Sequence, residues 1–266
     1  MLRYVRLLLA LARFSLLREM SFRGNFLAKV TVEMLWLFIL LAFYRVIFGR
    51  TNSIATWTEG EYLFFLGCSY ALSGLIETLF LENCSEFAEL VRSGDLDFAL
   101  LKPIDEQFLL SCRNIDWSTI PNVLVGFSLM GVSLWQFEQP IEPWRFFAFP
   151  VMLLCGLAIA YSFLLMLTST SVWMVRNQSL YELWWLAGSL MRYPTDIFER
   201  SWAWWIGRIF TFAVPIMLVI NVPAATVVKA LDPRMVAFTA VVSVLLLIVS
   251  RAVFRTALRR YRSASS

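Results

Sequence analysis

Long apolar stretches alternate with shorter polar segments along the chain, and this alternation predicts its architecture. Six stretches have the length of a membrane span: residues 27–48, 60–81, 117–136, 146–173, 203–223 and 235–254. A helix needs roughly 20 residues to cross a hydrocarbon core of about 30 Å. We therefore expect an all-α membrane protein with six transmembrane helices.

Composition supports the same fold class. Hydrophobic residues make up 59% of the 266 residues, charged residues 16%, and the mean hydropathy is +0.69. Six crossings leave roughly 130 residues for tails and loops, which is too few for a second globular domain. We expect residues 1–266 to form a single transmembrane domain.

The distribution of Lys and Arg predicts the orientation. If the N-terminus is inside, the inner segments and span ends hold 18 of the 23 basic residues. The outer side keeps Arg45, Arg50, Arg145, Lys229 and Arg234. Because cytoplasmic segments retain positive charge, both termini are predicted to be cytoplasmic. The net charge of +4 reflects this topology and gives no support for nucleic-acid binding.

The N-terminal segment, residues 1–25, is predicted to lie in the inner membrane interface. Arg3, Arg6 and Arg13 fall on one side of a helical wheel, opposite Leu8 and Phe14. Such a pattern is typical of an amphipathic interfacial helix. The alternative is a simple positive anchor for the first span.

Several kinds of chemistry lack their usual residues. There is no histidine, and none of the glycines begins a GxxxxGK[ST] phosphate loop. The four cysteines, at 68, 84, 112 and 155, lack the spacing of a zinc site. We therefore predict no catalytic residue, no metal site and no cofactor on this chain, and we disfavour a membrane enzyme.

The predicted inner loop at residues 82–116 carries the most informative pattern. Glu82, Glu86 and Glu89 recur at helical spacing, so the second span is expected to continue into an amphipathic helix. Gly94 fits a helix terminator, and Asp95 fits the cap of a short following turn. The alternative is a merely solvated charged loop.

Residues 92–103 read Arg-Ser-Gly-Asp-Leu-Asp-Phe-Ala-Leu-Leu-Lys-Pro. This segment resembles the G-x-L-D-x-x-L-x-[RK]-P stretch that follows the second span in a group of type-2 ABC exporter permeases. The overall plan is similar as well: the length, the six spans, the N-terminal interfacial helix, and a Tyr193-Pro194 pair before the fifth span.

The resemblance implies a type-2 ABC exporter fold in the bacterial cytoplasmic (inner) membrane. Two six-span subunits, alike or related, would pair, and each would seat a cytoplasmic coupling helix in a separate ABC ATPase that binds ATP and Mg²⁺. The cargo is unidentified, and an amphiphilic molecule is favoured. The implied coupling residues are Glu86, Glu89, Arg92, Gly94, Asp95, Leu96, Asp97, Leu100, Lys102 and Pro103.

A second inner connection is predicted at residues 174–202. Its apolar part, 180–191, is too short to span and is expected to be an interfacial or re-entrant helix. With Trp202, Trp204 and Trp205 it would place five tryptophans near the inner interface. These form either an ordinary aromatic belt or a lateral entry surface for an amphiphilic substrate.

Ionisable residues inside spans are candidates for the substrate pathway. Glu33, Glu77 and Arg208 are predicted to lie near the inner leaflet, either as a structural network or along an entry route. Pro215 and Pro223 are expected to break or kink the fifth span.

Two alternatives belong to other functional classes. A secondary transporter or channel would be expected to carry polar groups near the bilayer midplane in an inverted repeat, and no such repeat is visible. A structural membrane-assembly subunit is the second alternative. Co-purification of an ATPase would separate the ABC permease from both.

Overall fold

The computed structural model describes residues 2–137, 141–173, 179–199, 202, 204–229 and 232–261. The described part is helical apart from turns and one isolated β-bridge. Its α-helices are α1 (Leu2–Ser21), α2 (Arg23–Phe48), α3 (Glu59–Ile76), α4 (Glu82–Ser93), α5 (Leu96–Leu100), α6 (Glu106–Ser111), α7 (Ile120–Trp135), α8 (Pro143–Ser169), α9 (Ser179–Met191), α10 (Thr195–Glu199), α11 (Trp204–Arg208), α12 (Leu218–Val228) and α13 (Pro233–Arg260). Short π and 3-10 segments are η1 (Glu77–Leu81), η2 (Trp117–Thr119), η3 (Thr170–Val172) and η4 (Ile209–Ala213).

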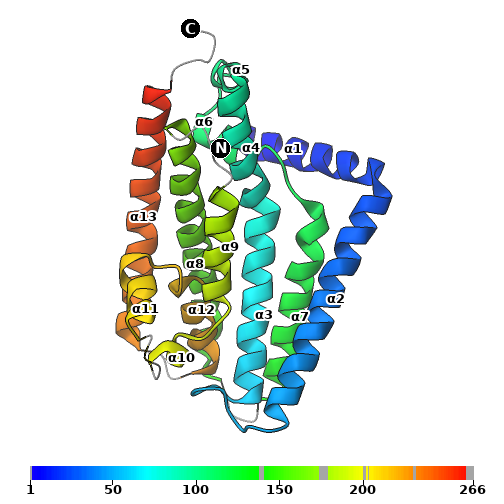
Figure 1. Cartoon of the computed structure of the whole chain (residues 1–266), viewed down its shortest axis with the longest axis vertical. Coiled ribbons are helices and arrows are strands. Elements are labelled where there is room, and N and C mark those ends of the chain that lie inside the picture. Colours follow the sequence, from blue (N-terminus) through cyan, green and yellow to red (C-terminus); the bar gives the residue numbers. More distant parts are fainter. Residues whose placement is uncertain are drawn as a thin grey trace.

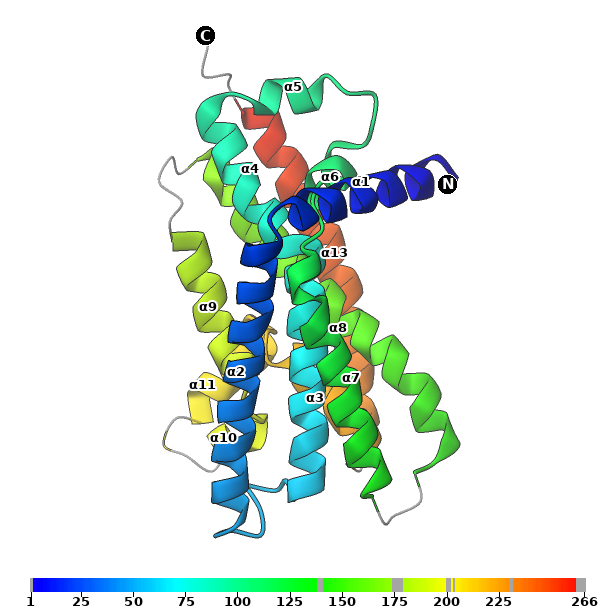
Figure 2. The same ribbon diagram turned by 90° about the vertical axis from the view of Figure 1, so that its right-hand side faces the viewer.

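The long helices form an elongated bundle (Figure 1). Among the described residues, five helices or helix runs are long and apolar enough to cross a membrane: α2, α3 with η1 and α4, η2 with α7, α8 with η3, and α13. They correspond to five of the six spans expected from hydropathy. We name the two ends of the bundle by the elements found there, the α4–α6 end and the α10 end. Helix α1 lies across the bundle near the α4–α6 end (Figures 1 and 2).

The core lies around α3, which packs on α7, α8 and α12. Helices α3 and α7 approach so closely that a Cβ on Gly126 would lie 2.6 Å from the carbonyl oxygen of Gly67. Small residues permit this backbone contact, which is the usual means by which helices associate in a membrane. Helix α2 is different, because it has no buried residue.

The second span continues without interruption into the amphipathic helix α4. The π-helical segment η1 joins α3 to α4, and all three form one candidate span of 35 residues, Glu59–Ser93. The helical continuation expected from the glutamate spacing is therefore present.

The predicted fifth span, residues 203–223, is not a single helix. Its two halves, Trp204–Ala213 and Leu218–Val228, are bent by 96° relative to one another. Pro215 lies in the break, and Val214 before it has a non-helical backbone with φ −120° and ψ 82°. Proline lacks the N–H that would continue a helix and disfavours helical geometry in the preceding residue. Pro223, by contrast, lies inside α12 and does not end it.

We call the two halves, Trp204–Ala213 and Leu218–Val228, the bent pair. The bent pair begins and ends at the α10 end of the bundle. Lys229, directly after α12, forms an ion pair of 3.0 Å with Asp196 of α10. Helix α9 instead runs lengthwise from the side of α4 toward α10 (Figures 1 and 2). The prediction that 174–202 stays at one end was therefore wrong for its described residues 179–199, because α9 runs along the bundle; residues 174–178, 200 and 201 lie outside the described part.

This correction moves the tryptophans and the Tyr193-Pro194 pair. Trp184 of α9 is buried, with 7% of its surface exposed to solvent. Trp202 lies in the connection between α10 and α11, and 83% of its surface is exposed. Tyr193 and Pro194 follow α9 instead of preceding a fifth span. The tryptophans do not form one cluster beside the α4–α6 end, so they do not make the entry surface considered from the sequence. Hydropathy alone does not distinguish a short lengthwise helix from a re-entrant pair.

Candidate functional site

Helix α4 extends the second span beyond the bundle core at the α4–α6 end. Its first half is held from the side, because Glu86 accepts a hydrogen bond of 2.5 Å from the side-chain nitrogen of Asn114. In its second half the charged side chains face solvent, and Glu89 pairs with Arg92 at 2.7 Å, whereas Leu90 and Val91 pack on the apolar cluster around Phe87. The predicted coupling residues on α4 thus differ in role, with Glu86 turned to the loop before η2 and the other two exposed.

Gly94 ends α4 and reverses the chain. Its φ of 83° is in the left-handed region, which glycine adopts without the steric cost that other residues meet. Asp95 follows, but its side chain does not cap the next helix as expected. It instead accepts a hydrogen bond of 2.8 Å from the hydroxyl of Ser93. The turn is therefore stabilised from the α4 side.

Helix α5 has an inner and an outer face. Leu96 is fully buried, and Leu100 packs against the same small cluster. On the other face, Phe98 and Leu101 are 70% and 80% exposed. The sequence motif contains both, but the predicted coupling set omitted them. Their apolar character at the tip of a charged loop was the signal that could have identified them.

Lys102 and Pro103 extend the exposed surface beyond α5. Asp97 of α5 is half-buried. We call the exposed apolar pair with the residues around it the α5 face: Asp95, Phe98, Leu101, Lys102 and Pro103.

The support beneath α5 is drawn from four parts of the chain. Leu96 packs with Phe87 of α4, Leu110 of α6, Leu165 of α8 and Phe254 of α13. Burying a residue of this kind contributes about 1.5–3 kcal/mol. The helix α5 is therefore fixed to three long helices despite its five residues.

Helix α6 is tied to the long helices by polar contacts. Arg251 of α13 pairs with Asp105 at 2.9 Å and donates to the side-chain oxygen of Gln107 at 3.2 Å. Gln107 in turn donates to the hydroxyl of Tyr161 of α8 at 2.9 Å. These contacts connect the loop after α5 to α8 and α13.

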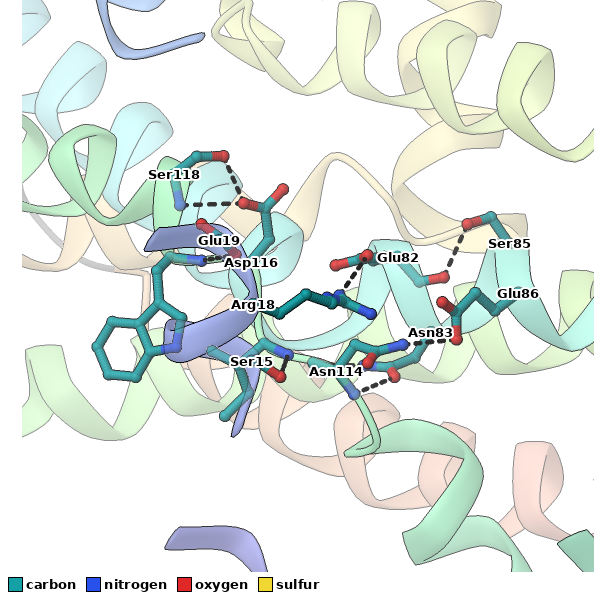
Figure 3. Close-up of polar contacts among 12 residues, drawn as sticks. Ser15, Arg18, Glu19, Glu82, Asn83, Ser85, Glu86, Asn114, Asp116 and Ser118 are labelled. Atoms are coloured by element: carbon teal, nitrogen blue, oxygen red, sulfur yellow. Dashed lines mark hydrogen bonds and ion pairs between the residues drawn. The ribbon is translucent and has the colours of Figure 1, made fainter. Parts of the chain in front are cut away.

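Helix α1 is joined to α4 and to the loop before η2 (Figure 3). Arg18 pairs with Glu82 at 3.1 Å. The carboxylate of Glu19 accepts a hydrogen bond of 2.8 Å from the backbone N–H of Trp117, and the hydroxyl of Ser15 accepts one from Ile115. Helix α1 is thus connected directly to the base of α4.

The buried Asn83 holds the loop in place. Its side chain donates to the carbonyl of Asn114 at 2.7 Å and accepts from the N–H of the same residue at 2.8 Å (Figure 3). Nearby, Asp116 accepts hydrogen bonds from Ser118 and lies 3.6 Å from the Lys29 ammonium. A small cavity of about 320 Å³ lies between this group and α1.

Burial raises the pKa of Glu19 at this junction, although the hydrogen bond from Trp117 acts in the opposite direction. The negative charges of Asp116 and Glu82 also raise it, while Lys29 lowers it. One oxygen of Glu19 is buried without a hydrogen-bond partner among the described residues. The junction therefore holds a carboxylate that is poorly solvated when charged.

The structure separates the three intramembrane candidates of the substrate pathway. Glu33 of α2 accepts a hydrogen bond of 3.2 Å from Asn122 of α7, and Glu77 is close enough to interact electrostatically with Glu33. Arg208 lies instead near the α10 end, in a cavity that Lys229 also lines. The basic group in electrostatic range of Glu77 is Arg192, directly after α9. Sequence reasoning missed it because it placed α9 at the inner interface.

Potential metal ligands do not gather in the part of the chain that the structure describes. No group of three or more Cys, Asp or Glu residues there could hold a metal ion. The arrangement at the α4–α6 end supports mechanical contact with a partner: a supported short helix with an exposed apolar tip.

Comparison with known proteins gives one result. A family model described as "ABC-2 family transporter protein" matches residues 34–265. No curated protein and no solved structure matches the chain.

Proposed function

The chain belongs to the ABC-2 family of transporter proteins, and from this premise we propose that it is the permease subunit of an ATP-driven exporter. In this proposal a separate ABC ATPase binds ATP and Mg²⁺ and hydrolyses the nucleotide. This multi-pass chain provides the path through the membrane and the surface on which the ATPase docks. The cargo is unidentified.

The exposed apolar pair on a supported helix is the observation that carries the docking proposal. Phe98 and Leu101 are among the most exposed large apolar residues, yet they lie outside the candidate spans, where no lipid would cover them. Interface energy is concentrated in a few such anchors surrounded by polar residues. Asp95 and Lys102 supply polar neighbours that would set the register with the partner.

The packing beneath α5 suggests how movement of the ATPase would be transmitted to the membrane-spanning helices. Helix α4 and α3 are parts of one candidate span, Glu59–Ser93, so displacement of the α5 face would move the second span directly. Arg18 and Glu19 would carry the same displacement to α1. A continuous helix transmits such a movement better than a flexible loop.

We place the α4–α6 end in the cytoplasm, with both chain termini. The α5 face must meet a cytoplasmic ATPase, and Lys and Arg cluster in the segments at this end, as the positive-inside rule requires. We propose that this membrane is a bacterial cytoplasmic membrane, as the resemblance to type-2 ABC exporter permeases implies.

A second permease copy, or a related permease, would complete the pathway. Helix α2 supports this pairing, since none of its residues is buried within the single chain. The expected complex contains two permeases and two ATPases. Mass measurement of the solubilised complex tests this, and a stable assembly with a single permease would refute the paired pathway.

Glu33 and Glu77 are retained as pathway candidates, and Arg192 takes the place of Arg208 beside them. Glu77→Gln is expected to leave folding and basal ATP hydrolysis intact and to abolish stimulation by the transported substrate. Glu106→Gln, on the exposed start of α6, is the matched control. Normal transport by the Glu77 variant would remove it from the pathway.

Docking is tested by purifying the tagged chain from its own cells and measuring a co-purifying protein that carries a GxxxxGK[ST] phosphate loop. Replacing Phe98 and Leu101 together with alanine should reduce this protein by about tenfold or more, because two anchors are lost. The double variant Asp95→Lys, Asp97→Lys should also release it.

Two controls match these variants. Trp135→Ala removes an apolar side chain that is 89% exposed elsewhere on the molecule, and Glu106→Lys reverses a charge at the α4–α6 end outside the α5 face. Both should retain the ATPase. Retention by all variants would contradict docking through α5.

A further inference from the structure

A large cavity lies at the α10 end, beside the bent pair. Its volume is about 940 Å³, within the range of ligand-binding sites. The walls come from α10, α11, η4, α12 and the start of α13. The two arms, which are bent by 96° relative to one another, both contribute to these walls.

Most of the cavity surface comes from apolar side chains. Phe212 of η4, Leu218 and Val222 of α12, and Met235 and Val236 of α13 line it. Phe212 also contacts Phe238 of α13, with ring centroids 5.4 Å apart, which joins the first arm of the bend to α13. Such a lining suits hydrocarbon.

One cation in the cavity, Arg208, lies against an aromatic ring. The guanidinium of Arg208 lies 4.9 Å from the ring centroid of Trp204. A cation–π contact engages the face of the guanidinium and leaves its N–H groups available at the edge. Among the described side chains, no carboxylate forms an ion pair with Arg208.

The other charges in the cavity already have partners. Lys229 pairs with Asp196 at 3.0 Å and lies 4.1 Å from the ring centroid of Trp57. Asp232 caps α13 by accepting a hydrogen bond of 2.9 Å from the N–H of Arg234. Among the described residues that line the cavity, Arg208 is thus the cation without a carboxylate partner, and the guanidinium fork matches a phosphate.

We propose that this cavity binds one amphiphile with a phosphate headgroup, whose phosphate contacts Arg208 and whose hydrocarbon chain occupies the apolar walls. The site lies at the opposite end from the α5 face and does not depend on the proposed function. Asp232 lines the same cavity and would accept a hydrogen bond from a hydroxyl on the headgroup, as phosphatidylglycerol provides.

The test measures binding of defined lipids to the purified full chain in detergent by native mass spectrometry. Phosphatidylglycerol should bind with one site per chain. Diacylglycerol, which lacks the phosphate, and glycerol phosphate, which lacks the chains, should each bind at least about tenfold more weakly. Tight binding of glycerol phosphate would indicate a site for a free phosphate compound instead, and equal binding of diacylglycerol would overturn the role of Arg208.

Variants separate the two halves of the site. Arg208→Gln should weaken phosphatidylglycerol binding by about tenfold, the factor expected for one charge-assisted hydrogen bond. Arg50→Gln, the same change in the exposed connection after α2, should leave binding unchanged. Ala225→Phe fills the cavity from α12 and should weaken binding without altering charge. If Arg208→Gln does not fold, Arg208→Lys keeps the charge, and unaltered binding by both Arg208→Lys and Ala225→Phe would overturn the proposal.

Discussion

Asn83 and Asn221 perform the same task at opposite ends of the bundle, but the segments that they hold differ. Asn83 makes two hydrogen bonds to the backbone of Asn114, in a loop that also forms a hydrogen bond with Ser15 of α1. Asn221 accepts a hydrogen bond of 2.8 Å from the N–H of Thr195 and donates to the carbonyl of Tyr193 at 3.4 Å. The first loop supports an exposed face, whereas the second closes one side of a cavity.

The support around these two sites also differs. At the α4–α6 end, polar contacts from α1, α8 and α13 surround a small apolar cluster. At the α10 end, the ion pair with Lys229 joins Asp196 of α10 to the end of α12, and a hydrogen bond from Thr56 joins it to the loop between α2 and α3. One end thus presents an exposed face on a packed support, whereas the other encloses a cavity.

The largest expected effect is at Leu96. Leu96→Ala empties the fully buried site under α5 and should cost about 3 kcal/mol of local stability. Proteolysis should then cut near α5, and ATPase binding should fall with it. Leu101→Ala, at a site that is 80% exposed, should leave the proteolysis pattern unchanged. Equal resistance of both variants would show that α5 is not held by this cluster.

The two asparagines provide a matched pair of intermediate size. Asn83→Ala leaves the buried N–H and carbonyl of Asn114 without their partner, which should cost about 2 kcal/mol. Asn221→Ala should cost less, because its contact with the carbonyl of Tyr193 is longer, at 3.4 Å. Thermal unfolding of the purified variants measures both. A larger loss of stability in Asn221→Ala than in Asn83→Ala would contradict the expectation that Asn83 contributes more.

The smallest effect is a pH dependence of opposite sign at the two ends. The pKa of Glu19 is raised, first of all by burial. Its contribution to the stability of the folded protein is therefore complete below the ordinary glutamate pKa of 4.5 and is lost as pH rises through the raised pKa. For Asp196, burial would raise the pKa, but hydrogen bonds from Thr56 and Lys229 outweigh it and the net shift is downward. Its stability is present above the ordinary aspartate pKa of 3.8 and is lost as pH falls through the lowered value.

Hydrogen exchange at several pH values measures this difference. As pH falls from 7 toward 4, the α1 junction should become better protected, while α10 should keep its protection. Glu19→Gln should remove the first trend, and Asp196→Asn should weaken α10 at pH 7. A parallel response of the two ends would contradict the assignment of these carboxylates.

The sequence predicted the α4–α6 end better than the α10 end, and the reason is physical. Glutamate spacing and Gly94 report local helix geometry, so the continuation of the second span into α4 and its termination were accessible from the sequence. Residues 203–223 have the composition of a span whether they run straight or turn back, and Pro215 indicates a break without indicating its direction. Arg208 was misplaced for the same reason, and the exposure of Phe98 and Leu101 depends on the packing of Leu96 against distant helices.

The most direct test of the central claim is hydrogen exchange of the chain with and without its ATPase in the same detergent. We predict that the ATPase protects backbone amides of α5 and the turn at Gly94, while amides of α10 to α12 exchange at unchanged rates. Protection at the α10 end, or unaltered exchange throughout α5 in a complex that is shown to be intact, would contradict docking through the α5 face.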